Sequence, residues 1–289
     1  MTKPSVGFLG LGAMGLPMAK HLIQNGYPLH ITCNRSRSPV DALVALGATE
    51  HSSAEEVAKH STFIVTILPT DKEMEEVLLA PSFIQSLTPG TTLIEMTSGS
   101  PSVMKRIAEA YLASGIQVLD APVSGGTVGA EKGKLTVMAA GDPSTLDHCQ
   151  SLLSCFAATI HYVGSIGAGK GIKAINQMMA AVHMLAVSEA TVLAEQLDIE
   201  PHILREVIMS SSGASWMLEN KLEALLEENY MPGFKLSLMR KDIQIAVGEG
   251  KALDLPLSNF ALALYQQAES TYGNLDFAAI SHYLSERGT

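Results

Sequence analysis

The segment GAGKGIKAINQ, residues 167–177, carries side chains that could act together on a substrate. Lys173 lies three residues before Asn176 and four before Gln177, so on a helix all three share one face. Burial lowers the pKa of a lysine, and a lysine in this apolar, glycine-rich setting would then suit proton donation near neutral pH. From this segment alone, a lysine whose ammonium simply reaches the solvent is the competing interpretation.

A second candidate is the turn Ser124-Gly125-Gly126, which follows an apolar run in DAPVSGG. A turn after a strand of a parallel sheet lies where such sheets bind ligands. Backbone N–H groups freed by glycines could hold a carboxylate there. An ordinary glycine-rich turn without a ligand is the alternative.

The sequence GLGAMG, residues 10–15, predicts a dinucleotide site, because it closes an apolar run and opens a helical pattern. Gly10 permits the tight turn, Gly12 lets the backbone approach a pyrophosphate, and Gly15 allows close packing of helix on strand. Helix N–H groups would then face the phosphates. The residues expected to contact the cofactor are Gly10, Gly12, Ala13, Met14 and Gly15.

The segment CNRSRSP, residues 33–39, indicates which dinucleotide would bind. An enzyme that uses NAD places an acid at this position to bind the ribose 2′-hydroxyl. Here the first acid of the chain is Asp41, and Asn34, Arg35 and Ser36 stand in its place. An arginine binds phosphate in a bidentate fashion, so the segment favours NADP(H), with Arg35 as the main contact. Whether Arg37 also reaches the 2′-phosphate is left open, and a solvated basic turn is the alternative.

The elements that must position these residues change character along the chain. Strand-like runs lie at 6–12, 28–34, 62–69, 91–98, 117–126, 134–142 and 159–164, alternating in the first part with helical patterns at 14–27, 38–49, 71–79 and 100–115. Helical patterns alone follow, at 168–197, 201–211, 215–228, 234–252, 258–271 and 276–286. Alternation predicts a mainly parallel sheet. We expect an α/β Rossmann domain over 1–164 and an all-α domain over 165–289.

Five segments together resemble the β-hydroxyacid dehydrogenase family, which includes 3-hydroxyisobutyrate dehydrogenase, tartronate semialdehyde reductase and the succinic semialdehyde/glyoxylate reductases. They are GFLGLGAMGLPMAKHL (7–22), DAPVSGGTVGAEKGKLTVMAAGD (120–142), GAGKGIKAINQ (167–177), SWMLEN (215–220) and FKLSLMRKDIQIA (234–246). They come in the family's order. The resemblance implies a Rossmann domain and a helical domain, of the type that follows it in 6-phosphogluconate dehydrogenase, joined by a long interdomain helix.

The resemblance also implies roles for individual residues. Lys173 would be the catalytic acid/base, and Asn176 would orient the substrate. The turn Ser124–Gly126 would hold the substrate carboxylate, and Lys241 would lie near both substrate and cofactor. Further cofactor contacts would come from Leu68, Pro69, Thr97 and Phe234, although core packing is a competing role for Phe234. The family's N-R-[ST] pattern in NADP-preferring members agrees with Asn34-Arg35-Ser36.

Composition excludes several other classes of protein. A net charge of −10 over 289 residues argues against a nucleic-acid surface. Three cysteines without a CxxC motif predict reduced thiols and a cytoplasmic protein, and the scattered histidines predict no metal site. The apolar run 174–195 is interrupted by polar residues and predicts a buried helix rather than a membrane span. The many apolar helices of the all-α domain favour oligomerisation, and the resemblance to the family implies a homodimer or homotetramer.

The predicted activity is hydride transfer between NADPH and a small β-hydroxyacid or semialdehyde, such as 3-hydroxyisobutyrate, tartronate semialdehyde, succinic semialdehyde or glyoxylate. An imine reductase on the same fold is one alternative, but those enzymes replace the catalytic lysine. A non-catalytic NADP-binding protein is the other, and inactive relatives also lose that lysine.

Overall fold

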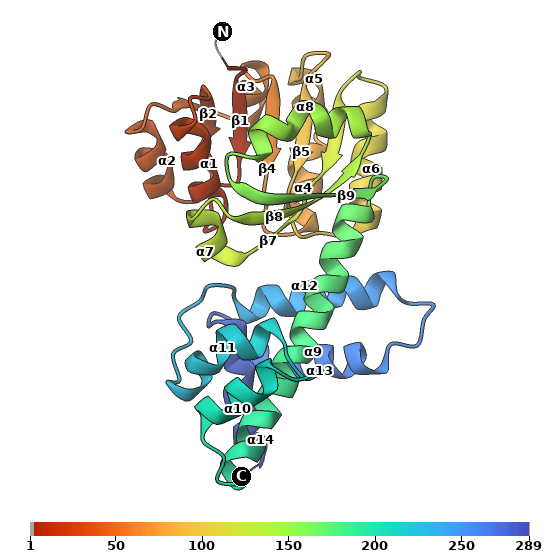
Figure 1. Cartoon of the computed structure of the whole chain (residues 1–289). Coiled ribbons are helices and arrows are strands. Elements are labelled where there is room, and N and C mark those ends of the chain that lie inside the picture. The colour runs from red at the N-terminus through yellow and green to blue at the C-terminus, as the bar shows by residue number, and fades with distance from the viewer. Residues whose placement is uncertain (1–2, 289) are drawn as a thin grey trace. The chain divides into compact units, whose positions relative to one another are not determined.

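The computed structural model describes residues 3–288 and divides after Lys173 into two compact units, each of which is described by itself (Figure 1). The strands of the first unit are β1 (Val6–Leu9), β2 (Leu29–Thr32), β3 (Thr49–His51), β4 (Phe63–Thr66), β5 (Thr92–Glu95), β6 (Gln117–Asp120), β7 (Val123–Ser124), β8 (Leu135–Gly141) and β9 (Ala157–Gly164). Within the described residues they form one nine-stranded sheet in the order β3-β2-β1-β4-β5-β6-β8-β7, with β9 paired to β8.

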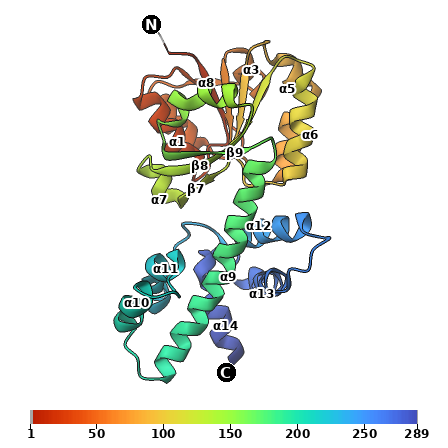
Figure 2. The ribbon, with the colours of Figure 1, turned by 45° about the vertical axis from the view of Figure 1, so that its right-hand side comes forward.

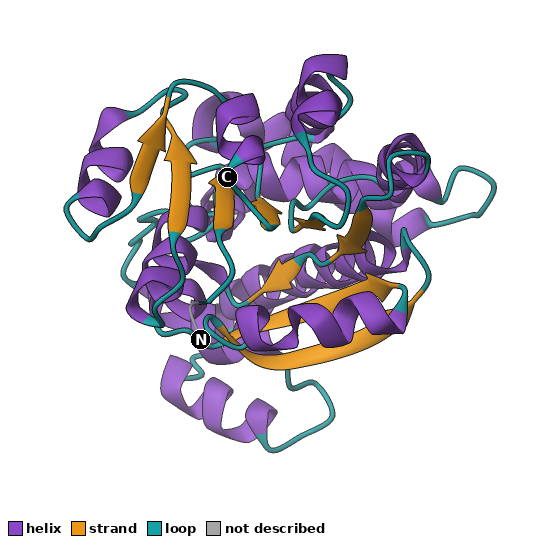
Figure 3. Ribbon diagram, turned by 90° about the horizontal axis from the view of Figure 1, so that it is seen from above, coloured by secondary structure: helices purple, strands orange, loops and turns teal. Residues whose placement is uncertain are grey.

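The sheet is mainly parallel, as predicted. The six neighbouring strands β3, β2, β1, β4, β5 and β6 all pair in parallel. Strand β8 runs antiparallel to β6 and β7 and parallel to β9. Figure 3, with strands in orange, shows that they fan out, which is the twist expected of such a sheet. The carboxyl ends of β1, β4, β5 and β6 therefore meet along one edge.

Helices cover both faces of this sheet (Figure 2). They are α1 (Gly15–Gln24), α2 (Arg37–Val44), α3 (Ala54–Lys59), α4 (Asp71–Leu78), α5 (Pro81–Ser86), α6 (Pro101–Leu112), α7 (Gly126–Glu131) and α8 (Pro143–Leu153). One apolar core joins the sheet to α1, α2, α7 and α8, and a second joins it to α3, α4, α5 and α6. Burial on both faces explains the continuous apolar strands VGFL and FIVT.

The second unit is helical. Its elements are α9 (Ala168–Gln196), which begins in the first unit, α10 (Pro201–Met209), α11 (Trp216–Leu226), α12 (Leu236–Glu249), α13 (Pro256–Tyr272), a 3-10 turn (Phe277–Ala279) and α14 (Ile280–Gly288). Alanine, leucine and methionine side chains dominate its core. Ser215 caps α11 by accepting a hydrogen bond from the Leu218 N–H at 3.1 Å. The predicted fold class, a Rossmann domain followed by a helical domain, is confirmed.

Some elements differ from the prediction. Strand β3 was not predicted, because three residues, Thr-Glu-His, are too few to show an alternating pattern. Helices α3, α5, α7 and α8 were also missed. In α8 a start signal was present, since Asp142 accepts a hydrogen bond from the Ser144 N–H at 2.8 Å and Pro143 follows it. The predicted strand 117–126 is interrupted, and Gly126 begins α7.

The predicted domain boundary at residues 164 and 165 stays a prediction.

By length and composition, α9 is the one helix within residues 3–288 that could cross a membrane. In its most apolar window 44% of the residues are buried, and core helices of soluble proteins meet the same criteria. The interpretation as a core helix is therefore retained.

Candidate active site

The glycine loop between β1 and α1 has the geometry that a dinucleotide requires. Gly10 has φ +103°, and a Cβ there would lie 2.1 Å from the Ile67 carbonyl oxygen. A Cβ at Gly15 would lie 1.9 Å from the Gly10 oxygen, so both glycines are required by close packing. A Cβ at Gly12 would meet no atom within 4 Å, so the backbone there faces open space. The first turn of α1 carries no acid and has no side-chain cap, which leaves its N–H groups for an anion. These residues fit a pyrophosphate.

The two arginines after β2 differ in how they are held. Arg37 bonds both oxygens of Glu50, at 2.5 and 2.8 Å, and Asp41 at 2.7 Å. Arg35 makes one contact, 3.2 Å from its Nη2 to Glu73 Oε1, and its side chain is 75% exposed. Arg35 is therefore the arginine available to an incoming phosphate, whereas Arg37 is occupied by β3 and its own helix.

Asn34 and Ser36 flank Arg35 and are exposed. Ser36 is the N-cap residue of α2, and its side chain makes no capping hydrogen bond. A hydroxyl and an amide are thus available beside the guanidinium of Arg35, without a negative charge among residues 32–36.

The turn at 124–126 adopts backbone angles that only glycine accepts easily. Gly125 has φ +128° and Gly126 has φ +61°. A Cβ at Gly126 would meet no atom within 4 Å, and this residue begins α7. The turn therefore presents open backbone after β7, as a carboxylate-binding loop would.

The first turn of α9 is fixed to the end of β6. Asp120 Oδ2 accepts hydrogen bonds from the N–H groups of Gly167, at 3.0 Å, and Lys170, at 3.2 Å. Lys173 lies one turn further along α9 than Lys170, and this residue is 8% exposed. Low exposure argues against the interpretation of Lys173 as a surface lysine. Lys173 thus follows directly after a turn that the carboxyl edge of the sheet holds.

A buried charge cluster lies at this edge, formed by Lys170, Glu95 and Asp120, all with 0% exposed side chains. The Lys170 ammonium donates to Glu95 Oε2 and, at 2.9 Å, to the Thr97 carbonyl oxygen. It also lies 3.4 Å from Asp120 Oδ1. Burial alone would lower the pKa of Lys170, but the two carboxylates outweigh it and hold that pKa above its ordinary value. Burial raises the pKa of Glu95, and Lys170 only partly offsets this.

The predicted cofactor contacts after β4 and β5 are tied to this cluster. The Thr97 N–H donates to Glu95, and the Thr97 hydroxyl accepts a hydrogen bond from the Leu68 N–H at 2.8 Å. Thr97 is fully buried, whereas Leu68 is partly buried and Pro69 is exposed. A direct cofactor contact of each residue stays a prediction.

In the second unit, hydrogen bonds link the polar residues of α9 to α12. Asn176 Nδ2 donates to Gln177 Oε1 at 2.9 Å, and Gln177 Nε2 donates to Asp242 Oδ2 at 2.9 Å. The other oxygen of Asp242 lies 3.1 Å from the Lys241 ammonium. Gln177 thereby orients both the amide of Asn176 and the lysine-aspartate pair of α12.

Phe234 is partly buried against the core of the helical unit. Its ring lies 6.1 Å from that of Phe277 in an edge-on arrangement. This supports the core-packing interpretation, while a cofactor contact stays untested.

The sequence motifs did not point to Lys170, to Glu95, to Gln177 as an orienting group, or to the pairing role of Asp120. For the cluster of Glu95, Asp120 and Lys170, the sequence did contain a signal. The buried runs TLIE and QVLD each end in an acid, and a buried carboxylate needs a partner. The first lysine of GAGKGIK, Lys170, could have been proposed as that partner.

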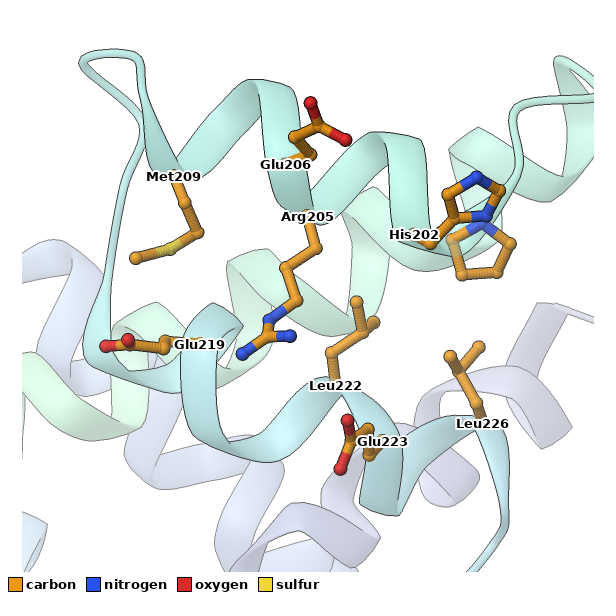
Figure 4. Close-up of a pocket in the computed structure, with 9 residues that line it drawn as sticks. His202, Arg205, Glu206, Met209, Glu219, Leu222, Glu223 and Leu226 are labelled. Carbon is orange, nitrogen blue, oxygen red and sulfur yellow. The ribbon is translucent and has the colours of Figure 1, made fainter.

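A surface groove between α10 and α11 contains none of the predicted site residues (Figure 4). Its volume is about 500 Å³ and it is lined by Pro201, His202, Arg205, Glu206, Met209, Glu219, Leu222, Glu223 and Leu226. Figure 4 shows Arg205 pointing from α10 toward α11 and Glu206 pointing away. Within residues 3–288 there is no cluster of three or more potential metal ligands, and Cys33, Cys149 and Cys155 are free thiols.

Comparison with known proteins agrees with this geometry. Residues 5–164 match the family model described as the NAD binding domain of 6-phosphogluconate dehydrogenase. Residues 167–284 match the one described as NAD-binding of NADP-dependent 3-hydroxyisobutyrate dehydrogenase.

Similar proteins include two bacterial enzymes and one solved structure. The chain is 36% identical over 260 residues to 2-(hydroxymethyl)glutarate dehydrogenase of Eubacterium barkeri, covering 89% of this chain and 86% of that one. It is 36% identical over 258 residues to 2-hydroxy-3-oxopropionate reductase of Escherichia coli, covering 89% and 87%. The structure of Mycobacterium tuberculosis 3-hydroxyisobutyrate dehydrogenase with L-serine has a TM-score of 0.90 at 30% identity, covering 97% and 99%.

Proposed function

The chain belongs to the β-hydroxyacid dehydrogenase family of nicotinamide-dependent oxidoreductases, and from this we propose that it reduces a small carboxylate-bearing aldehyde or keto acid with NADPH. The observation that carries the proposal is the position of Lys173. It follows the first turn of α9, which Asp120 holds at the carboxyl edge of the sheet. Sheets of this kind bind their ligands at that edge.

The preference for NADPH rests on the residues after β2. Arg35 is the exposed and weakly held arginine there, and no acid stands among residues 32–36. An acid would repel a 2′-phosphate, whereas a guanidinium binds it with charge-assisted hydrogen bonds. Asn34 and Ser36 add neutral donors beside Arg35. With NADPH, reduction is the proposed physiological direction.

In the proposed mechanism, Lys173 is the general acid. Its protonated ammonium hydrogen-bonds the substrate carbonyl oxygen and gives up its proton as negative charge develops there. The bound nicotinamide supplies the hydride for the carbonyl carbon. Asn176, whose amide is oriented by Gln177 at 2.9 Å, fixes the position of the same oxygen.

Two groups of residues hold the reactants in this proposal. The open backbone at Ser124–Gly126 binds the substrate carboxylate and so sets the distance from anchor to reacting carbon. Lys241, paired with Asp242 at 3.1 Å, adds positive charge for substrate and cofactor. Residues 1–164 would bind the cofactor, and residues 165–289 would complete the substrate site and the oligomer, a homodimer or homotetramer. Free thiols support a cytoplasmic location.

The first test is the oxidation of NADPH and NADH by the purified protein with glyoxylate, succinic semialdehyde, tartronate semialdehyde and methylmalonate semialdehyde, with a cyclic imine as control. Turnover of an acid-bearing carbonyl with NADPH supports the proposal and identifies the substrate class. Lys173→Ala should lower the kcat of that turnover by a factor of roughly 10²–10⁴ and leave the Kd for NADPH unchanged.

Two outcomes would favour the alternatives. Turnover of the cyclic imine alone would indicate an imine reductase, against which Lys173 argues. Tight NADPH binding without turnover of any compound would indicate a non-catalytic protein. Loss of both binding and turnover in Lys173→Ala would mean that Lys173 is structural.

A further inference from the structure

Lys170 is a second lysine near the start of α9. It lies on the first turn, three residues before Lys173, and it cannot touch a substrate. Its side chain is 0% exposed, and its ammonium is enclosed by Glu95, Asp120 and the Thr97 carbonyl oxygen. A charge that is buried this completely is costly, even when it is paired. The proposed chemistry gives Lys170 no direct step.

The partners of Lys170 come from two neighbouring strands. Glu95 ends β5 and Asp120 ends β6, so the ammonium joins the carboxyl ends of both strands to α9. Glu95 also accepts hydrogen bonds from the Thr66 hydroxyl at 3.3 Å and the Thr97 N–H at 3.1 Å. The cluster therefore extends from β4 to β6 and fixes the backbone on which Thr97 lies.

Two glycines allow the start of α9 to pack closely, Gly167 against α6 and Gly169 against the sheet. Gly167 has φ +94°, and a Cβ there would lie 2.8 Å from Lys105 Cε. A Cβ at Gly169 would lie 2.6 Å from the Met138 carbonyl oxygen and 2.8 Å from the Asp120 carbonyl oxygen. At Gly169 the backbone of α9 therefore lies against β6 and β8 without room for a side chain, and Lys170 adds ion pairs to that contact.

We propose that Lys170 is a positioning residue whose buried ammonium fixes the first turn of α9 against β5 and β6 and so sets the place of Lys173. Lys173 follows Lys170 by three residues, so the two side chains are one helical turn apart. A shift in the turn would move the acid group, and a displacement of about 1 Å at a reacting group costs up to roughly 100-fold in rate. The proposal rests on the proposed function, because it assumes that Lys173 is the acid.

The cluster also links the other segments that are expected to contact the cofactor. Lys170 bonds the Thr97 carbonyl, and the Thr97 hydroxyl accepts the Leu68 N–H at 2.8 Å. One ammonium thus positions the loops after β4 and β5 together with the start of α9. A lysine that merely stabilised the fold would not need to connect these particular loops.

The decisive variant is the double substitution Glu95→Gln with Lys170→Met. Removing Lys170 alone would leave two buried carboxylates facing each other, and that protein could fail to fold. The double variant removes one charge of each sign, and glutamine retains an oxygen for the Thr66 hydroxyl and the Thr97 N–H. Tyr111→Phe is the matched control, since it deletes a buried hydrogen bond of the same unit, Tyr111 to the Leu78 oxygen at 2.8 Å, away from α9.

Three quantities are compared with the unmodified protein: kcat and KM for the substrate found in the panel, the Kd for NADPH, and amide hydrogen exchange across residues 167–173. We expect kcat of the double variant to fall about 10- to 100-fold. The Kd for NADPH should stay within about threefold, because the phosphates bind at the glycine loop. Exchange should quicken across 167–173 in the double variant but not in Tyr111→Phe, which should retain its kcat.

A double variant with slow exchange, or one with wild-type kcat despite faster exchange, would overturn the proposal. Failure of the proposed function has a different signature, namely an unmodified protein that is inactive on the whole panel. In that case, faster amide exchange across residues 167–173 in the double variant would still show that Lys170 holds the turn, and unchanged exchange would show that it does not.

Discussion

At the scale of single residues, the choice of cofactor depends on which arginine of CNRSRSP is available. Arg37 is engaged by two carboxylates, Glu50 and Asp41. Arg35 makes one contact, with Glu73. Because a guanidinium binds phosphate only if its donors are accessible, Arg35 should carry the 2′-phosphate contact and Arg37 should not. The sequence left open whether Arg37 also reaches the 2′-phosphate, and its ion pairs with Asp41 and Glu50 argue against that contact.

Arg35→Ala should raise the Kd for NADPH by an amount equivalent to about 1–3 kcal/mol and leave the Kd for NADH unchanged. Fluorescence titration with each cofactor measures this. Arg37→Ala is the matched control and should change neither Kd by more than about twofold. An equal loss for NADPH and NADH would show that Arg35 does not contact the 2′-phosphate.

Glu73 competes with the phosphate for Arg35, because its Oε1 lies 3.2 Å from Arg35 Nη2. The Thr70 hydroxyl lowers the pKa of Glu73, with a further contribution from Arg35, so the carboxylate stays charged at neutral pH. Glu73→Gln should tighten NADPH binding several-fold without changing NADH binding, since a surface ion pair is worth up to about 1 kcal/mol. Weaker NADPH binding in this variant would mean that Glu73 orients Arg35 instead.

At the scale of elements, three histidines join strands β2 and β3 to helix α3. His30 Nδ1 lies 2.9 Å from His51 Nε2, and the rings of His51 and His60 stack at 4.6 Å. Burial lowers the pKa of His30, and the neighbouring histidines lower it further. Burial and His60 likewise lower the pKa of His51. The folded protein therefore disfavours the protonation of both rings.

This cluster makes stability depend on pH in a defined direction. The unfolded chain binds these protons near pH 6.5, whereas the folded chain binds them only at lower pH. Stability is thus complete above about pH 6.5 and is lost as the pH falls from there toward the lowered pKa values. The urea midpoint should fall more between pH 7.5 and 5.5 in the unmodified protein than in His51→Asn. His202→Asn, an exposed histidine of α10, should behave as the unmodified protein does, and equal losses in all three would contradict the argument.

Sequence patterns predicted the long elements well and the short ones poorly. The runs VGFL and FIVT and the helical periodicity after residue 168 are long enough for burial to leave a pattern. Strand β3 holds Glu50 and His51 and pairs with β2. This pairing depends on tertiary contacts, and a run of three residues is too short to show a pattern that predicts it. For the same reason the engagement of Arg37 by Glu50 could not be predicted.

At the scale of the whole molecule, both units bury polar groups, and these groups differ in their partners. The first unit buries Lys170 with two acids. The second unit buries the Tyr265 hydroxyl, which has no hydrogen-bond partner within the described residues. The glycine loop and Lys173 were predictable from their motifs. The charge cluster beneath Lys173 was not, because it joins residues 75 and 50 positions apart in the chain.

Lys170→Met should lower the free energy of unfolding by about 3–5 kcal/mol, because it leaves buried carboxylates without their cation. The double variant with Glu95→Gln should recover much of this loss. Urea denaturation followed by circular dichroism measures both. A single variant as stable as the unmodified protein would show that the cluster is neutralised in another way.

Tyr265→Phe should raise the free energy of unfolding by about 1 kcal/mol, since the hydroxyl is desolvated without a partner. The same urea titration tests this, with Tyr111→Phe as the control that should lose stability, because Tyr111 donates to the Leu78 oxygen. Destabilisation of Tyr265→Phe would indicate a buried water at that hydroxyl.

The three glycines of the segment GAGKG differ in which substitutions they tolerate. Gly167 has φ +94°, and Gly169 faces carbonyl oxygens of Met138 and Asp120, so neither position tolerates a side chain. Gly171 lies in the same helix, and a Cβ there would meet no atom within 4 Å. The first two glycines are thus constrained by the structure, and the third is not. Saturation mutagenesis should leave 167 and 169 invariant while 171 drifts freely, with alanine favoured there by its helix propensity.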